Sequence, residues 1–151
     1  MMIADPVVLC AFFFFLGLYI FKPKYYGCDT VPLAHAVLAG SISNYIWANR
    51  SLSSWVDDLL SCDYSPTYLE SLVPMITFSY GLFDIVQGFR DGTQFLLHGI
   101  ALTAICISLY VVDGLHYFTI ALLMEMSTIF LNLRPLNSLV IDICFAGLFF
   151  F

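Results

Sequence analysis

The sequence predicts an all-α membrane protein, a bundle of about six transmembrane helices, and three observations support this. Hydrophobic residues make up 61% of the 151 residues and the mean hydropathy is +0.92, which is far too apolar for a soluble domain of this length. Roughly 20 helical residues cross the ~30 Å hydrocarbon core, and the chain divides into apolar stretches near that length. When the crossings alternate, nearly all the basic residues fall on one side.

Prolines, glycines and asparagines between the apolar stretches mark where each helix ends. The first stretch is followed by Lys22 and Lys24 and preceded by no basic residue, a charge order typical of a retained helix. We therefore divide the chain into an N-terminal helix with a basic loop at residues 1–30 and a main transmembrane domain at residues 31–151. The expected spans are Ile3–Phe21, Val31–Ala48, Tyr68–Gly88, Phe95–Val112, Leu115–Leu133 and Leu136–Phe151.

The distribution of charge predicts the orientation of the chain. Basic residues are enriched in cytoplasmic loops, so we expect their side to be cytoplasmic and the N-terminus to be lumenal or outside. The long connection between the second and third spans then lies on the other side, with Arg50. The basic residues on the cytoplasmic side are Lys22, Lys24, Arg90 and Arg134.

The same long connection alternates apolar and acidic residues at helical spacing. This pattern predicts a short interfacial helix that covers one end of the bundle. Its residues are Trp55, Val56, Asp57, Asp58, Leu59 and Leu60.

Ionisable residues inside the predicted spans are the strongest functional signal. A charged side chain near the bilayer centre costs about 2.5–3.5 kcal/mol on insertion scales, so such groups usually face a bundle interior or a wet cavity. At 1.5 Å per residue, most of them lie in the cytoplasmic half of the membrane. We expect Asp84 to pair with His98, or Glu125 with His35, and the sequence leaves open which pair forms. These residues are His35, Asp84, His98, Glu125 and Asp142.

Polar side chains continue along two of the helix faces that carry these groups. Tyr80 and Gln87 share a face with Asp84, and Thr128 and Asn132 share a face with Glu125. The faces converge, which predicts a lipid pocket open to the cytoplasmic leaflet. The alternative is that these groups only hydrogen-bond across helices, a role worth about 0.6 kcal/mol on average. The predicted pocket residues are His35, Tyr80, Asp84, His98, Glu125, Thr128 and Asn132.

Several other classes of function lack support. The formal charge is −6 with no basic cluster, so we expect no nucleic-acid partner. Five scattered cysteines without a C-x-x-C pair indicate neither a zinc nor a redox site, and three histidines are too few for a membrane di-iron centre. We therefore expect no metal and no resident cofactor. The phenylalanines at residues 12–15 are interpreted as lipid-facing or packing bulk.

Four segments resemble the TLC-domain family, which includes ceramide synthases, translocon-associated TRAM proteins and small proteins linked to lipid composition. The block E-M-S-T-I-F-L-N-L-R is most similar to the small lipid-regulating branch. The resemblance implies about six helices around a central cavity and an endoplasmic-reticulum or related endomembrane. The segments are V-P-L-A-H-A at 31–36, S-Y-G-L-F-D-I at 79–85, F-L-L-H at 95–98 and the block at 125–134.

The resemblance to the synthases themselves is incomplete. Gly99 follows His98 where they carry a second histidine, and their later His-Asp pair has no counterpart. We therefore expect a protein that binds membrane lipids or regulates sphingolipid, phospholipid or fatty-acyl composition, and is not an enzyme. One alternative is an acyltransferase that uses acyl-CoA, with His98 as base and Asp84 as its orienting partner. Another is a structural or cargo-handling membrane protein.

The chain ends at Phe151, where the family usually continues with another span. An incomplete bundle would expose its carboxylates to lipid, which is costly. We therefore expect further chain, or a homo- or hetero-oligomer, to complete the bundle.

Overall fold

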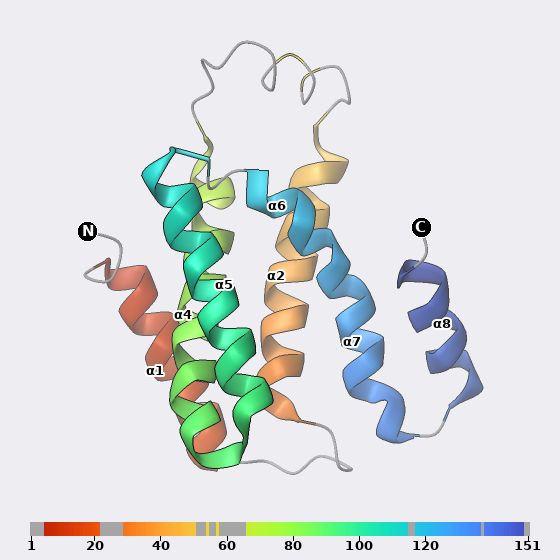
Figure 1. Cartoon of the computed structure of the whole chain (residues 1–151). Helices are drawn as coiled ribbons and strands as arrows, with labels where there is room; N and C mark the ends of the chain where they lie inside the picture. The colour runs from red at the N-terminus through yellow and green to blue at the C-terminus, as the bar shows by residue number, and fades with distance from the viewer. Residues whose placement is uncertain are drawn as a thin grey trace.

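The computed structural model describes residues 5–21, 29–50, 54, 57, 66–114, 117–136 and 138–149. Its helices run side by side as a bundle, which confirms the all-α prediction (Figure 1). Two 3₁₀ turns, η3 at Leu122–Met124 and η4 at Arg134–Leu136, flank α7. The helices are α1 Pro6–Phe21, α2 Thr30–Ala48, α4 Tyr68–Asp91, α5 Thr93–Val111, α6 Phe118–Ala121, α7 Glu125–Leu133 and α8 Leu139–Phe149.

Local sequence signals set where the helices begin. The Asp5 carboxylate accepts a hydrogen bond from the Val7 amide at 2.8 Å, and Pro6 occupies the first helical position of α1. Thr67 and Glu70 form a reciprocal capping box in front of α4. These caps satisfy amide groups that the first turn of each helix would otherwise leave without a partner.

Helices α4 and α5 pack closely because glycines line their contact. A Cβ atom added to Gly99 would lie 2.6 Å from the Gly81 carbonyl oxygen, and one added to Gly81 would lie 2.8 Å from Thr103 Oγ1. Gly92, with φ of 138°, is the one residue between the two helices. Small residues let helix backbones approach in this way. This close approach of the two helices places His98, the neighbour of Gly99, in contact with α4.

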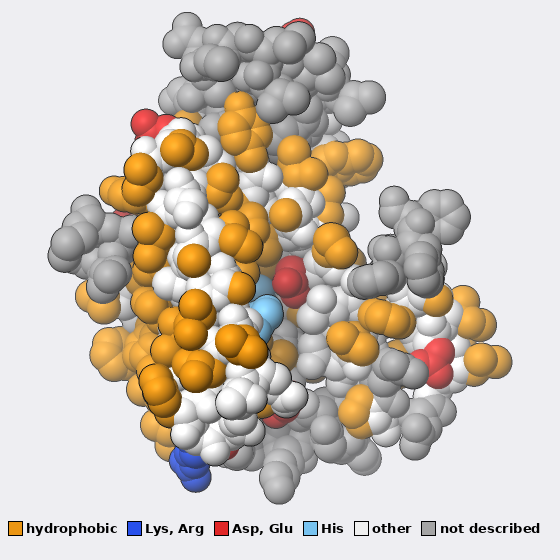
Figure 2. Space-filling view, in the orientation of Figure 1, with side chains coloured by type: hydrophobic (Ala, Val, Ile, Leu, Met, Phe, Trp, Pro, Cys, Tyr) orange, Lys and Arg blue, Asp and Glu red, His pale blue; other side chains and the backbone are white. Residues whose placement is uncertain are grey.

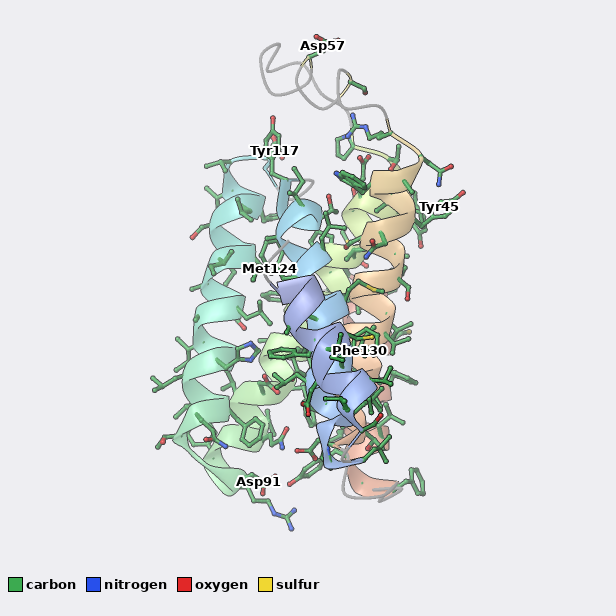
Figure 3. All side chains as sticks on the ribbon, turned by 90° about the vertical axis from the view of Figure 1, so that its right-hand side faces the viewer. Tyr45, Asp57, Asp91, Tyr117, Met124 and Phe130 are labelled. Atoms are coloured by element: carbon green, nitrogen blue, oxygen red, sulfur yellow. The ribbon has the colours of Figure 1, made fainter. Side chains whose placement is uncertain are left out.

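The other helices are arranged around α2 and α4. Helix α1 packs on α4, and α2 packs on both α4 and α7. Helix α8 packs on the outer side of α7, and Figure 3 shows it in front of that helix. Among the described helices, α4 and α5 are long and apolar enough to cross a membrane, by length and composition.

Several predicted helix boundaries differ from the structure. The span predicted at Leu115–Leu133 is divided into α6, η3 and α7, and residues 115 and 116 lie outside the described residues. No proline or glycine marks this break, which coincides with the packing of Leu122 into the core. Helix α4 runs on to Asp91, past the predicted end at Gly88.

The last predicted span, Leu136–Phe151, begins later than expected. Leu136 belongs to the 3₁₀ turn η4, and Ser138 precedes the helix and accepts its first hydrogen bonds. The 11 residues of α8 rise only about 16 Å, roughly half of the hydrocarbon core. The start predicted at Ile3 and the interfacial residues Trp55, Val56, Asp58, Leu59 and Leu60 lie outside the described residues.

Candidate functional site

Asp84 and His98 form a short hydrogen-bonded pair between α4 and α5. His98 Nδ1 lies 2.6 Å from Asp84 Oδ2, the carboxylate is fully buried, and the imidazole is 55% exposed. An ionised carboxylate only accepts hydrogen bonds, so Nδ1–H of His98 is the donor to it. The other ring nitrogen, Nε2, is then directed away from Asp84.

His35 and Glu125 form the second predicted pair, between α2 and α7. His35 Nδ1 lies 3.9 Å from Glu125 Oε2, and its Nε2 lies 3.2 Å from Thr77 Oγ1. The His35 ring is buried, while the Glu125 side chain is 22% exposed. Both pairings that the sequence left open are therefore present.

Tyr80 lies between the two histidines. Its ring stacks on His35 with centroids 4.1 Å apart and an interplanar angle of 9°, and it meets His98 edge-on at 6.1 Å. Its phenol lies within electrostatic range of both Asp84 and Glu125. We call these five residues the polar cluster: His35, Tyr80, Asp84, His98 and Glu125.

The remaining predicted site residues lie at the edge of the cluster or away from it. The Thr128 hydroxyl interacts with the Glu125 carboxylate one turn earlier on α7. Asn132 donates to the Thr128 carbonyl at 2.9 Å, so its amide group bonds to its own helix. Asp142, on α8, has an exposed side chain and is not buried with the others.

The polar cluster opens sideways between α5 and α7. Helix α5 packs mainly on α4 among the described helices, whereas α7 packs on α2 and α8. Figure 2 shows a histidine and an acidic side chain next to each other in the hollow between these helices. The exposed parts of His98 and Glu125 therefore face the surroundings of the bundle and not its packed interior.

Phe15 closes the opposite side of the cluster, a role that the sequence analysis missed. Its buried ring meets Tyr80 edge-on at 5.5 Å and His35 at 6.2 Å. Phe15 and Val8 are both buried against α4 and lie seven residues apart. This helical spacing is the signal that could have distinguished Phe15 from its exposed neighbours. Thr77 was also missed, although it lies seven residues before Asp84 on α4.

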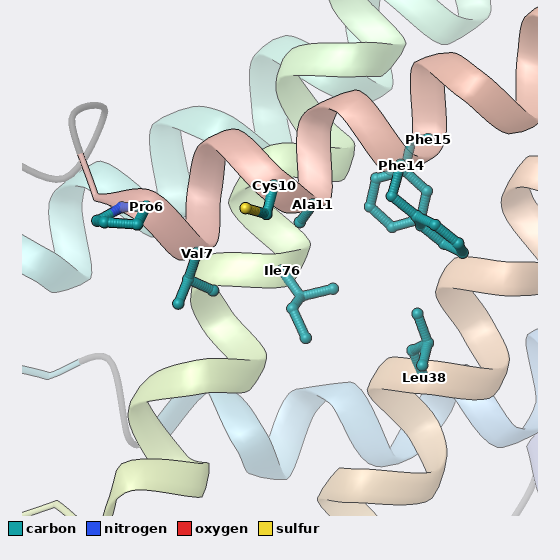
Figure 4. Close-up of a pocket in the computed structure, with 8 residues that line it drawn as sticks. All are labelled: Pro6, Val7, Cys10, Ala11, Phe14, Phe15, Leu38 and Ile76. Carbon is teal, nitrogen blue, oxygen red and sulfur yellow. The ribbon is translucent and has the colours of Figure 1, made fainter.

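An apolar groove of about 510 Å³ lies on the far side of Phe15 (Figure 4). Residues of α1 between Pro6 and Phe15 form most of its wall, with Leu38 of α2 and Ile76 of α4 opposite. The groove does not reach the polar cluster because the Phe15 ring stands between them. This groove and the ionisable residues are therefore separate features of the bundle.

Comparison with known proteins gave one finding. The family model of the TLC domain matches residues 27–151, which include all five cluster residues and exclude α1. No curated protein and no solved structure matched the chain.

Proposed function

This chain belongs to the TLC-domain family of membrane proteins, and we propose that it binds lipid, or regulates membrane lipid composition, through the polar cluster. The proposal agrees with the family, which is linked to membrane lipids. The motifs from which the sequence analysis inferred the resemblance lie inside the matched range, so that inference is confirmed.

The observation that carries the proposal is the depth and exposure of the Asp84–His98 pair. A carboxylate buried inside an apolar helix bundle is expensive, and groups of this kind usually mark a functional site. The imidazole that donates to Asp84 Oδ2 is half exposed in the opening between α5 and α7. A lipid head group entering there would meet His98 and Glu125 while its acyl chains stayed in the hydrocarbon.

The finer assignments belong to the same proposal. A sphingolipid, a phospholipid or a fatty-acyl chain is the ligand class, and an endoplasmic-reticulum or related endomembrane is the location, with the N-terminus lumenal. The opening between α5 and α7 is also where a homo- or hetero-oligomer would cover the exposed carboxylate.

Lipid mass spectrometry on the full chain, extracted into nanodiscs with its native lipids, tests the proposal. We expect a stoichiometric lipid that is lost in Asp84→Asn and in Glu125→Gln. Asp113→Asn is the matched control, because Asp113 is exposed beyond the end of α5 and its φ of 54° suits asparagine. If the variants lose thermal stability but keep the lipid profile of the unaltered chain, the polar cluster is structural and the proposal is wrong.

The geometry of the pair also favours a second candidate, an N-acyltransferase. A buried carboxylate that orients an imidazole is the arrangement of a general base, with Nε2 of His98 as the proton acceptor. In that reaction the base would take a proton from an amine as its nitrogen attacks an acyl-CoA thioester, forming the amide and releasing the thiol. Gly99 argues against the synthase form of this chemistry, because a Cβ there would meet α4 backbone atoms.

An assay with purified protein, a fatty acyl-CoA and a sphingoid base separates the two candidates. Product that forms with the unaltered chain and disappears in His98→Ala would establish the acyltransferase. Co-purified lipid with no product supports the binding protein. Gln94→Ala, one turn earlier on α5 and exposed, controls for changes in that helix.

A further inference from the structure

A stripe of polar residues runs along one face of α4, from the polar cluster to the end of the helix. Tyr80, Asp84, Gln87 and Asp91 are spaced at i, i+4, i+7 and i+11, so their side chains share a face. The first three are buried and Asp91 is exposed. Figure 3 shows Asp91 at the end of the bundle, opposite the end that carries Tyr117. The stripe therefore connects the buried carboxylate with an exposed one.

Three residues of the stripe take part in hydrogen bonds through their side chains. Asp91 Oδ2 accepts from Gln87 Nε2 at 3.2 Å and from the Tyr19 hydroxyl at 2.8 Å. Asp84 Oδ2 accepts from His98 Nδ1 at 2.6 Å. Asp84 and Asp91 are therefore both hydrogen-bonded, but these bonds do not join Asp84 to Gln87.

The missing link lies between two buried oxygen atoms. Asp84 Oδ1 and Gln87 Oε1 have no hydrogen-bond partner within the described part of the chain. Leaving such an atom unsatisfied costs about 1–3 kcal/mol. Both oxygens are acceptors, so they cannot bond to each other and need a group with two donors. One water that donates a hydrogen bond of about 2.8 Å to each oxygen would satisfy both.

We propose that Asp84 and Gln87 hold an ordered water, and that this water is the route by which the Asp84–His98 pair exchanges protons with the aqueous phase at Asp91. Asp84 takes the Nδ1 proton of His98, gives it to the bridging water and returns a proton of that water to Nδ1. The water then exchanges with the aqueous phase past Asp91, so Gln87 only holds the water and carries no proton. The other ionisable group beside Asp84 is Tyr80 of α4, whose phenol lies within reach of the carboxylate, while Glu125 of α7 acts on Tyr80 and His98. The route needs no lipid, so it stands or falls independently of the proposed function.

Entry of water along α4 is favoured over entry from the side. Helix α5, which forms one edge of the opening, carries large exposed apolar side chains such as Leu97 and Ile105. Hydrocarbon against that face excludes water, whereas Asp91 lies exposed at the end of the stripe. The Asp84–His98 pair therefore has a lipid-facing side at His98 and a water-facing side through Gln87.

The test measures how fast the Nδ1 proton of His98 exchanges with water, by NMR saturation transfer on the full chain with ¹⁵N-histidine in nanodiscs. Gln87→Met keeps the length of the side chain and removes its acceptor. We expect it to slow the exchange by about tenfold, the factor that corresponds to one hydrogen bond of about 1.4 kcal/mol. Gln94→Met is the matched control, since Gln94 lies one turn from His98 on α5 and is exposed.

The comparison of Gln87→Met with Gln94→Met decides whether the route exists. Slower exchange in Gln87→Met with unchanged exchange in Gln94→Met supports the route. Unchanged exchange in Gln87→Met, or equal slowing in both variants, overturns it. If Gln87→Met does not fold, water-edited spectra of the unaltered chain decide: transfer from water to the Gln87 amide and the His98 ring supports the route, and its absence overturns it.

Discussion

Replacing Gly99 by alanine tests how strongly the close approach of α4 and α5 holds the site together. The added methyl group would lie 2.6 Å from the Gly81 oxygen, 2.7 Å from the Ile85 nitrogen and 2.9 Å from Asp84 Cβ. Two of these three atoms belong to the backbone, so no side chain can rotate to make room. Helix α5 must move away from α4, and His98 moves with it.

The size of the effect follows from a comparison with Gly17→Ala. Gly17 lies inside α1 with no heavy atom within 4 Å of the added Cβ. Alanine is favoured over glycine inside a helix by about 1 kcal/mol, and this gain is common to both variants. The difference between them therefore isolates the steric effect, which is about 1–3 kcal/mol for an overpacked core. We expect Gly99→Ala to be less stable than Gly17→Ala by that amount.

Thermal unfolding of both variants in one detergent measures the difference. For a chain of about this length, 1 kcal/mol shifts the midpoint by roughly 2–4 °C, so the expected gap is about 2–12 °C. In Gly99→Ala the downfield proton signal of the hydrogen bond between His98 and Asp84 should also weaken. Equal midpoints with an intact signal would refute the account of the α4–α5 contact.

Three further predictions test other parts of the fold. Phe15→Ala should lower the free energy of unfolding by about 3–5 kcal/mol because the ring is fully buried. Phe14 is 47% exposed, so Phe14→Ala should lower it by under about 1 kcal/mol. Equal losses in the two variants would contradict the packing of α1. Glu70→Gln keeps the capping box but removes the charge 2.8 Å from Arg50. Urea unfolding should show that the free energy of unfolding falls by about 1–3 kcal/mol. An unchanged free energy would mean that the ion pair does not stabilise the chain. Ser79→Ala removes a hydroxyl that lies 3.0 Å from a carbonyl oxygen of α1. Urea unfolding should show that the free energy of unfolding falls by only about 0.6 kcal/mol. A fall of more than ~2 kcal/mol would mean that this hydrogen bond has a larger role.

The common depth of Asp84 and His98 was predictable from helix geometry. Asp84 and His98 lie eight and six residues from Gly92, which joins the two helices, so a rise of 1.5 Å per residue puts them at nearly the same level. The sequence did not choose between this pair and the one formed by His35 and Glu125. Both form because the two carboxylates lie on different helices, and each faces a different histidine.

Features that depend on tertiary packing were not predictable from one sequence. Phe15 sits in a run of four phenylalanines, and only the position of α1 against α4 decides which ring is buried. The turn at Leu122 carries no proline or glycine and is set by packing into the core. The start of α8 was misplaced because Pro135 was interpreted as the break itself, whereas η4 extends the break through Leu136.

Helix α1 contributes to the site although it lies outside the matched TLC region. It is attached to α4 at three levels: the Val8 carbonyl bonds to Ser79, the Phe15 ring packs on Tyr80, and the Tyr19 hydroxyl bonds to Asp91. The middle contact encloses the polar cluster, and the last one lies on the proposed water route. The division of the chain at residue 30 therefore stays a prediction. Without α1, the closed side of the cluster and the Asp91 end of the stripe would not form in the same way.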